Sequence, residues 1–247
     1  MKKKIMALLL VLAMATTMLA ACGGGGTNAD GNKEIKASVF WYEESDVYLS
    51  TVRTALNKEL EAAGIKYDNQ FAGNDQAKQI DQIKTAIAGG TNLLIVNIVT
   101  SGAPDTAQDI IDAAGDIPVI FFNRAIGTEG SDVKVLNDNK TACFIGTDAP
   151  EAGHMQGKMI GEYLVENYDT VDLNGDGVIS YAMMKGQEGN VEAEFRTQYG
   201  VEDANAVLKA AGKAELKYFD ANNKDCYQVA DFSQSVKSTT CGVRISR

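Results

Sequence analysis

The sequence predicts an α/β fold made of two lobes, each with a parallel sheet flanked by helices. Three observations carry this prediction. Apolar runs of strand length alternate with amphipathic runs of helix length, the links between them are short, and one polar stretch in mid-chain breaks the rhythm. The chain has 247 residues, which is enough for two modest lobes with separate cores.

The first lobe is expected over residues 35–126. Its later strands are short and mostly apolar, as expected of strands covered on both faces, and glycines close two of its helices. The predicted strands are 35–42, 65–71, 93–99 and 117–123, and the predicted helices are 51–64, 75–90 and 105–115.

A partial second lobe is expected over residues 142–247. The polar stretch 127–141 is predicted to be the hinge and crossover between the lobes, because it interrupts the alternation. Pro150 favours a helix start at that point. The predicted strands are 142–148, 179–186 and 214–220, and the predicted helices are 150–168 and 191–211.

Residues 1–21 are typical of a secretory signal peptide, with three lysines followed by a short apolar run. The run is too short for a stable membrane span. The small residues before Cys22 resemble a bacterial lipoprotein signal, which implies that Cys22 is lipidated and tethers the chain to the outer face of the cell membrane. The alternative is a plain secretory signal with an incidental cysteine. Residues 22–34 are glycine-rich and predict a flexible tether.

The net charge of −10 argues against a nucleic-acid partner and against binding to an acidic membrane surface. Three further cysteines match no zinc-binding pattern. Cys143 lies in an apolar strand-like run and is expected to be buried. Whether Cys226 and Cys241 pair stays open.

Polar residues gather where predicted strands end, which is where ligands bind in parallel sheets. The segment 42–48 follows the first strand, Asn97 lies near the end of the third, and Arg124 follows the fourth. Carboxylate, amide and guanidinium groups beside aromatic rings suit a neutral polyol. Taken alone, polar residues at strand ends are more often only turn formers and helix caps. The single histidine, His154, gives no catalytic set, so an enzyme is not expected.

Seven separate segments between residues 35 and 220 resemble the galactose/glucose-binding proteins in order and spacing. The clearest are IKASVFWYEESDVYLSTVRTAL, IPVIFFNR, FIGTDAPEAGHMQGKMI and KGQEGNVEAEFRTQYG. The resemblance implies a type I periplasmic-binding-protein fold and a monomer that binds galactose or glucose between its lobes. It further implies delivery of the sugar to the permease subunits of an ABC importer, with no bond broken.

The same resemblance implies the sugar contacts. In the second lobe the family's His-x-Asp-x-x-x-Arg pattern is matched with asparagine for histidine and with glutamate for aspartate, which leaves the exact sugar open. The implied ligand-binding residues are Tyr42, Asp46, Tyr48, Asn97, Asn190, Glu192 and Arg196. Trp41 is expected to pack in the core, because strand alternation points it away from Tyr42.

The segment DLNGDGVIS fills five ligand positions of a calcium loop, but Met183 stands where an EF-hand has its bidentate glutamate. An ordinary turn would read the same way. The resemblance implies a lone structural calcium site whose glutamate comes from a distant segment, and we expect weakened binding here. The candidate ligands are Asp172, Asn174, Asp176, the Val178 carbonyl and Ser180.

The run after about Ser233 lacks apolar periodicity and suggests a shifted reading frame. The resemblance implies further strands, crossovers and sugar contacts after this point, so the second lobe is expected to be incomplete, with reduced stability and weak sugar binding. Two alternatives to transport stay open. One is a sugar-sensing lipoprotein for chemotaxis or signalling, and the other is a calcium-binding fragment without a transport role.

Overall fold

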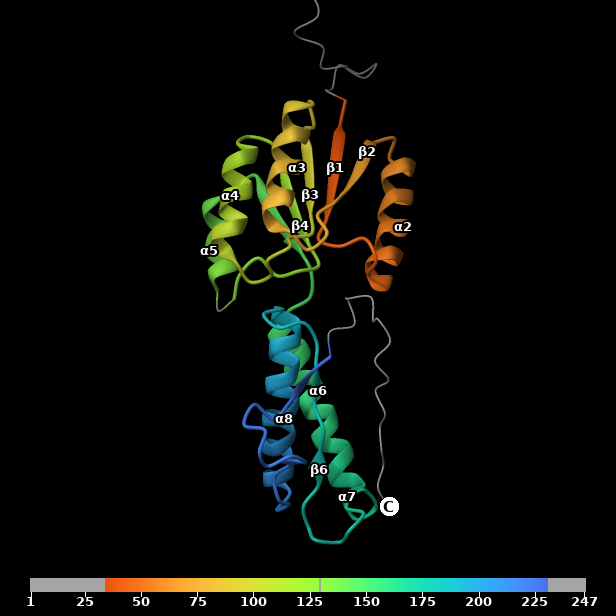
Figure 1. The fold of residues 1–247 in the computed structure, drawn as a ribbon, viewed down its shortest axis with the longest axis vertical. Coiled ribbons are helices and arrows are strands. Elements are labelled where there is room, and N and C mark those ends of the chain that lie inside the picture. Colours follow the sequence, from red (N-terminus) through yellow and green to blue (C-terminus); the bar gives the residue numbers. More distant parts are fainter. Residues whose placement is uncertain (1–33, 129, 231–247) are drawn as a thin grey trace, which may run out of the picture.

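The computed structural model describes residues 34–128 and 130–230. It consists of two α/β lobes joined end to end (Figure 1). The predicted class, parallel sheet flanked by helices, is confirmed. None of the helices in this described part combines the length and apolar content that crossing a bilayer requires.

The first lobe is built on a five-stranded sheet with the order β2-β1-β3-β4-β5, and every neighbouring pair is parallel. Because the strands are parallel, their carboxyl ends share one edge, and this edge faces the second lobe (Figure 1). The strands are β1 (Lys36–Trp41), β2 (Lys66–Phe71), β3 (Leu93–Val96), β4 (Val119–Phe122) and β5 (Ala142–Ile145).

Helices cover the two faces of this sheet unequally. Three of them pack on one face over a core that includes Phe40, Ile83 and Phe121, whereas a single helix packs on the other face and places its Leu49 in one core cluster with Trp41. The three are α3 (Gln76–Ala88), α4 (Pro104–Ala114) and α5 (Ser131–Asp138), and the single one is α2 (Val47–Ala62).

Aspartate side chains set the starts of two of these helices. Asp46 accepts a hydrogen bond from the Leu49 amide at 2.9 Å, and Asp75 accepts one from the Lys78 amide at 3.0 Å. The first cap explains why α2 begins at Val47, earlier than the predicted helix 51–64.

The predicted crossover at 127–141 is wrong. Within it lies α5, where Val135 packs into the first core together with Leu136. The next segment, β5, pairs with β4 as the last strand of the first sheet and does not open the second lobe. The chain instead passes between the lobes at residues 146–148. Apolar side chains at helical spacing in an otherwise polar stretch account for the error.

The second lobe contains a long helix pair and four two-residue strands. β6 pairs with β8 and β7 with β9, both in parallel. The predicted strand 179–186 is therefore two short strands. The elements are α6 (Ala149–Glu166), α7 (Tyr168–Val171), β6 (Ser180–Tyr181), β7 (Met184–Lys185), α8 (Val191–Ala210), β8 (Lys217–Tyr218) and β9 (Gln228–Val229).

A row of glycines lets α6 and α8 approach closely. Gly153, Gly157 and Gly161 recur at four-residue spacing on the face of α6 that meets α8. A Cβ added at Gly157 would lie 2.1 Å from the Tyr199 carbonyl oxygen, so only glycine fits there. This packing fixes the axis of α8, whose first turn points at the first lobe (Figure 1).

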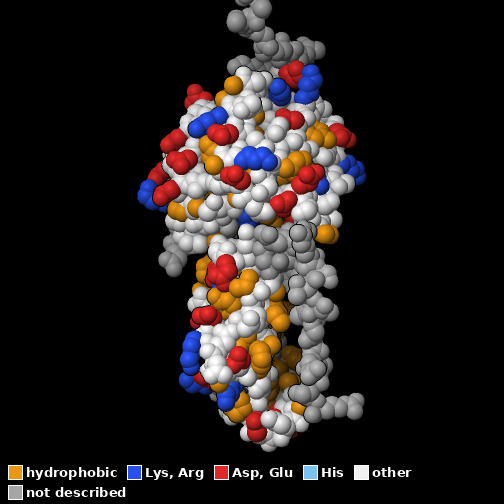
Figure 2. Space-filling model, viewed as in Figure 1, with side chains coloured by type: hydrophobic (Ala, Val, Ile, Leu, Met, Phe, Trp, Pro, Cys, Tyr) orange, Lys and Arg blue, Asp and Glu red, His pale blue; other side chains and the backbone are white. Residues whose placement is uncertain are grey.

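Apolar side chains remain exposed on both lobes. Cys143 is exposed on the edge strand β5, next to Ile145 on the face that α5 does not cover. The expectation that Cys143 is buried is therefore wrong. On α6, Met155, Met159 and Tyr163 are exposed at helical spacing, and Figure 2 shows hydrophobic side chains gathered over the second lobe.

Candidate functional site: the interlobe cleft

A cavity of about 750 Å³ lies where the carboxyl edge of the first sheet meets the first turns of α8. The first lobe, the crossing segment and the second lobe all contribute to its lining. Six of the seven predicted ligand-binding residues lie here together, namely Tyr42, Asp46, Tyr48, Asn190, Glu192 and Arg196.

Tyr42 and Asp46 form one hydrogen-bonded unit on the first-lobe side. The Tyr42 hydroxyl donates to Asp46 Oδ2 at 2.7 Å, while Asp46 Oδ1 accepts from the Leu49 amide. Burial of Tyr42, followed by its hydrogen bond to Asp46, raises the pKa of the phenol above its ordinary value. Asp46 therefore both caps a helix and lines the cleft. The interpretation as a helix cap and the interpretation as a cleft residue both apply to it.

The two aromatic residues near this unit differ in exposure. Tyr48, in the first turn of α2, is 64% exposed and its ring is free to stack on a ligand at the cleft. Trp41 is completely buried, and its Nε1 donates to Asn69 Oδ1 at 2.7 Å. The prediction that Trp41 packs in the core is confirmed.

Asn97 does not line the cavity. Its backbone is fixed by bonds to the Phe40 carbonyl and from the Gln79 side chain. Its side-chain amide is completely buried, and neither amide atom has a partner among the described residues. Asn97 is therefore the one predicted ligand-binding residue that the structure does not place in the lining of the cleft.

The second-lobe side of the cleft is the start of α8. Asn190 caps this helix, because its Oδ1 accepts from the Ala193 amide at 3.0 Å. Both carboxylate oxygens of Glu192 are buried and have no partner among the described residues. Arg196 lies one turn further along and is exposed at the cleft.

Arg124 also lines the cleft, although the family resemblance does not assign it. It is only 4% exposed, and its guanidinium lies 4.0 Å from the centroid of the Tyr42 ring. It donates to the Val99 carbonyl in the first lobe and to Gln187 Oε1 in the second. Its place directly after a predicted strand was the available signal.

The charges of the cleft balance. Asp46 and Glu192 bring two carboxylates, while Arg124 and Arg196 bring two guanidinium groups. A cleft with this set of charges favours neither a cation nor an anion. Its guanidinium groups can donate to ligand hydroxyl groups, and its carboxylates can accept from them.

The predicted calcium loop closes on itself through its own side chains. Asp172 accepts from the amides of Gly175 and Gly177, and Asp176 accepts from the Val178 amide. Within the part of the chain that the structure describes, no cluster of three His, Cys, Asp or Glu residues could hold a metal. The loop itself contributes two carboxylates, those of Asp172 and Asp176.

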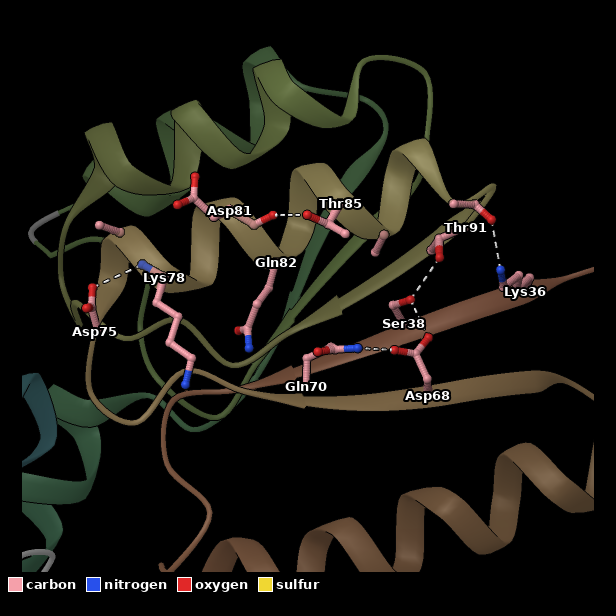
Figure 3. Close-up of a pocket in the computed structure, with 13 residues that line it drawn as sticks. Lys36, Ser38, Asp68, Gln70, Asp75, Lys78, Asp81, Gln82, Thr85 and Thr91 are labelled. Atoms are coloured by element: carbon pink, nitrogen blue, oxygen red, sulfur yellow. Dashed lines mark hydrogen bonds between the residues drawn. The ribbon is translucent and has the colours of Figure 1, made fainter.

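A second polar cavity, of about 700 Å³, lies between β2 and α3 (Figure 3). The Ser38 hydroxyl donates to Asp68 at 2.6 Å and bonds with the Thr91 hydroxyl at 2.8 Å, while Gln70 donates to Asp68 at 2.6 Å. These groups satisfy one another, and only one buried acceptor, Gln82 Oε1, has no partner among the described residues. One acceptor does not define a ligand site.

Two lobes of parallel sheet with a polar cleft between them define a bilobal binding protein of the type I periplasmic fold. The chain belongs to the periplasmic binding protein domain family, whose model matches residues 37–238.

A curated relative, the D-galactose/methyl-galactoside binding periplasmic protein MglB of Haemophilus influenzae, is 33% identical over 185 residues. The match covers 74% of this chain and 53% of the relative. The ribose import binding protein RbsB of Bacillus subtilis is 23% identical over 171 residues, covering 69% of this chain and 52% of that protein. The chain thus spans about half the length of these relatives.

Solved structures show the same fold. The periplasmic binding protein component of the arabinose ABC transporter from Shewanella sp. ANA-3 has a TM-score of 0.56 and 20% identity. The alignment covers 80% of this chain and 55% of that one. Several predictions concern residues outside the described ranges: the predicted signal peptide, Cys22, the predicted tether up to residue 33, Cys241 and the run after about Ser233.

Proposed function

We propose that this chain binds a monosaccharide, galactose or glucose, in the interlobe cleft as the solute-binding component of an ABC sugar importer. The observation that carries the proposal is Glu192, a carboxylate that lines the cleft with both oxygens buried and without a partner in the described part of the chain. A buried carboxylate in this state is costly until donors reach it, and sugar hydroxyls are such donors.

The rest of the cleft supports a neutral, hydroxyl-rich ligand. Asp46 still has acceptor capacity beyond its two bonds, and Arg196 offers several donors. The exposed ring of Tyr48 supplies an aromatic face for the C–H side of a sugar ring. The similarity to MglB, which is named for D-galactose and methyl-galactoside, favours galactose over ribose.

Asn97 is a further candidate contact for the ligand, although it does not line the cavity. Its buried amide, which has no partner in the described ranges, follows the end of β3, next to β1, which leads directly into Tyr42. A ligand hydroxyl that reached Asn97 would satisfy a donor and an acceptor at once. The proposal therefore includes Asn97 as a contact made when the ligand is bound.

Calorimetric titration of the purified chain with galactose, glucose, ribose and arabinose tests the proposal. We expect saturable binding of galactose or glucose, weaker binding of the two pentoses, and no turnover of any sugar by product analysis. Equal heats for all four sugars, or none for any, would contradict it. Glu192→Gln serves as the matched site variant.

We further propose that the loop of Asp172, Asn174, Asp176, the Val178 carbonyl and Ser180 binds calcium weakly. Sites with few charged ligands fall toward millimolar affinity, so calcium should raise the melting temperature only at about millimolar concentration. Asp176→Asn should abolish that rise. A rise at micromolar calcium would require a carboxylate that this loop does not contain.

Lipid attachment at Cys22, on the outer face of the cell membrane, is the localisation that we propose for the chain. Mass spectrometry of the membrane fraction tests it, because a diacylglyceryl-type adduct should disappear in Cys22→Ser. Recovery of the unmodified wild-type chain from the medium would contradict it.

A further inference from the structure

We propose that Arg124 is an interlobe latch, which holds α8 against the first lobe and is itself held by the residues that bind the sugar. The Arg124 guanidinium reaches both lobes: it donates to the Val99 carbonyl on the first-lobe side and to Gln187 Oε1 on the second. Because the side chain is 4% exposed, these charge-assisted bonds form away from water, where they are strongest.

A backbone turn at the end of β4 directs Arg124 toward the cleft. Asn123 has a φ of 65°, in the left-handed region that asparagine tolerates better than most residues. Across it, the Arg124 amide donates to the Phe122 carbonyl at 2.8 Å, which makes a tight three-residue turn at the end of β4. This turn sends the chain out of the sheet at the cleft, and such backbone strain is common at functional positions.

Tyr42 supplies the platform for the latch. The guanidinium lies 4.0 Å from the ring centroid, within the range of a cation–π contact. The hydroxyl of the same ring donates to Asp46, a residue of the proposed sugar site. A continuous chain of contacts therefore runs from Asp46 through Tyr42 and Arg124 to Gln187.

Gln187 is the point where the latch takes hold of the second lobe. The backbone carbonyl of Gln187 accepts from the backbone amide of Asn190, which caps α8. Glu192 follows two residues after Asn190. Fixing Gln187 therefore fixes the end of α8 that carries the second-lobe ligand contacts. The bond acts beside the side chain of Val191, the first residue of α8, which lies against Gly102 of the first lobe.

The latch couples closure to occupancy. A sugar hydroxyl bonded to Asp46 restrains Tyr42, and a restrained ring keeps the guanidinium over it and in reach of Gln187. Ligand binding and lobe closure then favour each other, as linkage requires. The coupling to sugar rests on the proposed function, whereas the latch itself does not.

The experiment uses Gln187, which is half-buried and whose replacement leaves Arg124 in place. Gln187→Met keeps the side-chain length but removes the acceptor, and Gln187→Glu offers Arg124 a carboxylate. Gln198→Met is the matched control, because Gln198 is exposed on α8 and its side chain bonds, among the described residues, only Glu202. Small-angle scattering of the ligand-free chains reports the lobe arrangement, calorimetry reports galactose affinity, and thermal unfolding confirms that each variant folds.

We expect Gln187→Met to be more extended than the wild type without sugar and to bind galactose about tenfold more weakly. Gln187→Glu should remain as compact as the wild type, and Gln198→Met should match the wild type in both measurements. Identical scattering of Gln187→Met and the wild type would overturn the latch. If Gln187→Met opens while no variant binds a monosaccharide, the latch stands and the proposed function fails.

Discussion

The Tyr42 hydroxyl donates to the Asp46 carboxylate at 2.7 Å, so the end of β1 and the cap of α2 form one unit at the cleft. Asp46 thereby has three tasks: it caps a helix, it holds Tyr42, and it faces the cavity. Substitutions at Asp46 can separate these tasks, because asparagine and alanine remove different ones.

We expect Asp46→Asn to lose most sugar affinity while it keeps stability, and Asp46→Ala to lose both. Asparagine caps helices as well as aspartate does, whereas alanine at a cap costs about 1 kcal/mol of unfolding free energy. Removing the acceptor charge weakens bonds to sugar hydroxyls in both variants. Urea unfolding and calorimetry measure the two effects. Asp75→Asn, at the cap of α3, is the control that should leave sugar binding unchanged.

Glu192→Gln should reduce galactose affinity by about tenfold or more without lowering the free energy of unfolding. The two carboxylate oxygens are buried and have no partner within residues 34–128 and 130–230, so neutralising them removes a desolvated charge and breaks no bond seen there. Chemical denaturation and calorimetry check both statements. A large loss of stability in this variant would mean that Glu192 has a structural partner.

The strand and helix pattern predicted the class of fold because buried parallel strands and amphipathic helices leave separate signals. The lobe boundary was missed for a physical reason. Val135 and Leu136 pack α5 into the first core. The residues around them are mostly polar, so the composition of the segment is that of a linker. Burial of Cys143 was predicted from an apolar run, yet an edge strand covered on one face leaves half of its side chains exposed.

The cleft was more predictable than the contacts within it. Strand ends in a parallel sheet meet at one edge, so Tyr42, Asp46 and Arg124 had to lie near one another. Sequence position could not show that Arg124 reaches Gln187, because that bond depends on how the lobes are joined. Nor could it show that Asn97 lies outside the cavity lining, since this depends on side-chain direction within a short strand.

Gly157→Ala should destabilise the second lobe by about 2 kcal/mol or more, because the added Cβ would lie 2.1 Å from the Tyr199 carbonyl oxygen. The backbone cannot yield without separating α6 from α8. Gly186→Ala is the control, since its Cβ would lie 3.4 Å from the Ala193 Cβ, an ordinary contact. Thermal unfolding compares the two. Equal melting temperatures would show that the helix pair is looser than this packing implies.

Tyr42 makes stability depend on alkaline pH. Burial and the bond to Asp46 raise the pKa of its phenol above the ordinary value of about 10, so the unfolded chain releases this proton before the folded one does. The contribution of Tyr42 is therefore constant below about pH 9 and declines as pH rises past 10, by up to about 1.4 kcal/mol per pH unit. Tyr42→Phe removes the hydroxyl and keeps the ring under Arg124.

The stability difference between the wild type and Tyr42→Phe should accordingly shrink between about pH 9 and about pH 11, while it stays level between about pH 7 and about pH 9. Urea unfolding across this range measures it. Tyr163→Phe is the control, because Tyr163 is 60% exposed on α6 and does not line the cleft. If the stability difference from the wild type declined equally for Tyr42→Phe and Tyr163→Phe, the alkaline sensitivity would lie elsewhere in the protein.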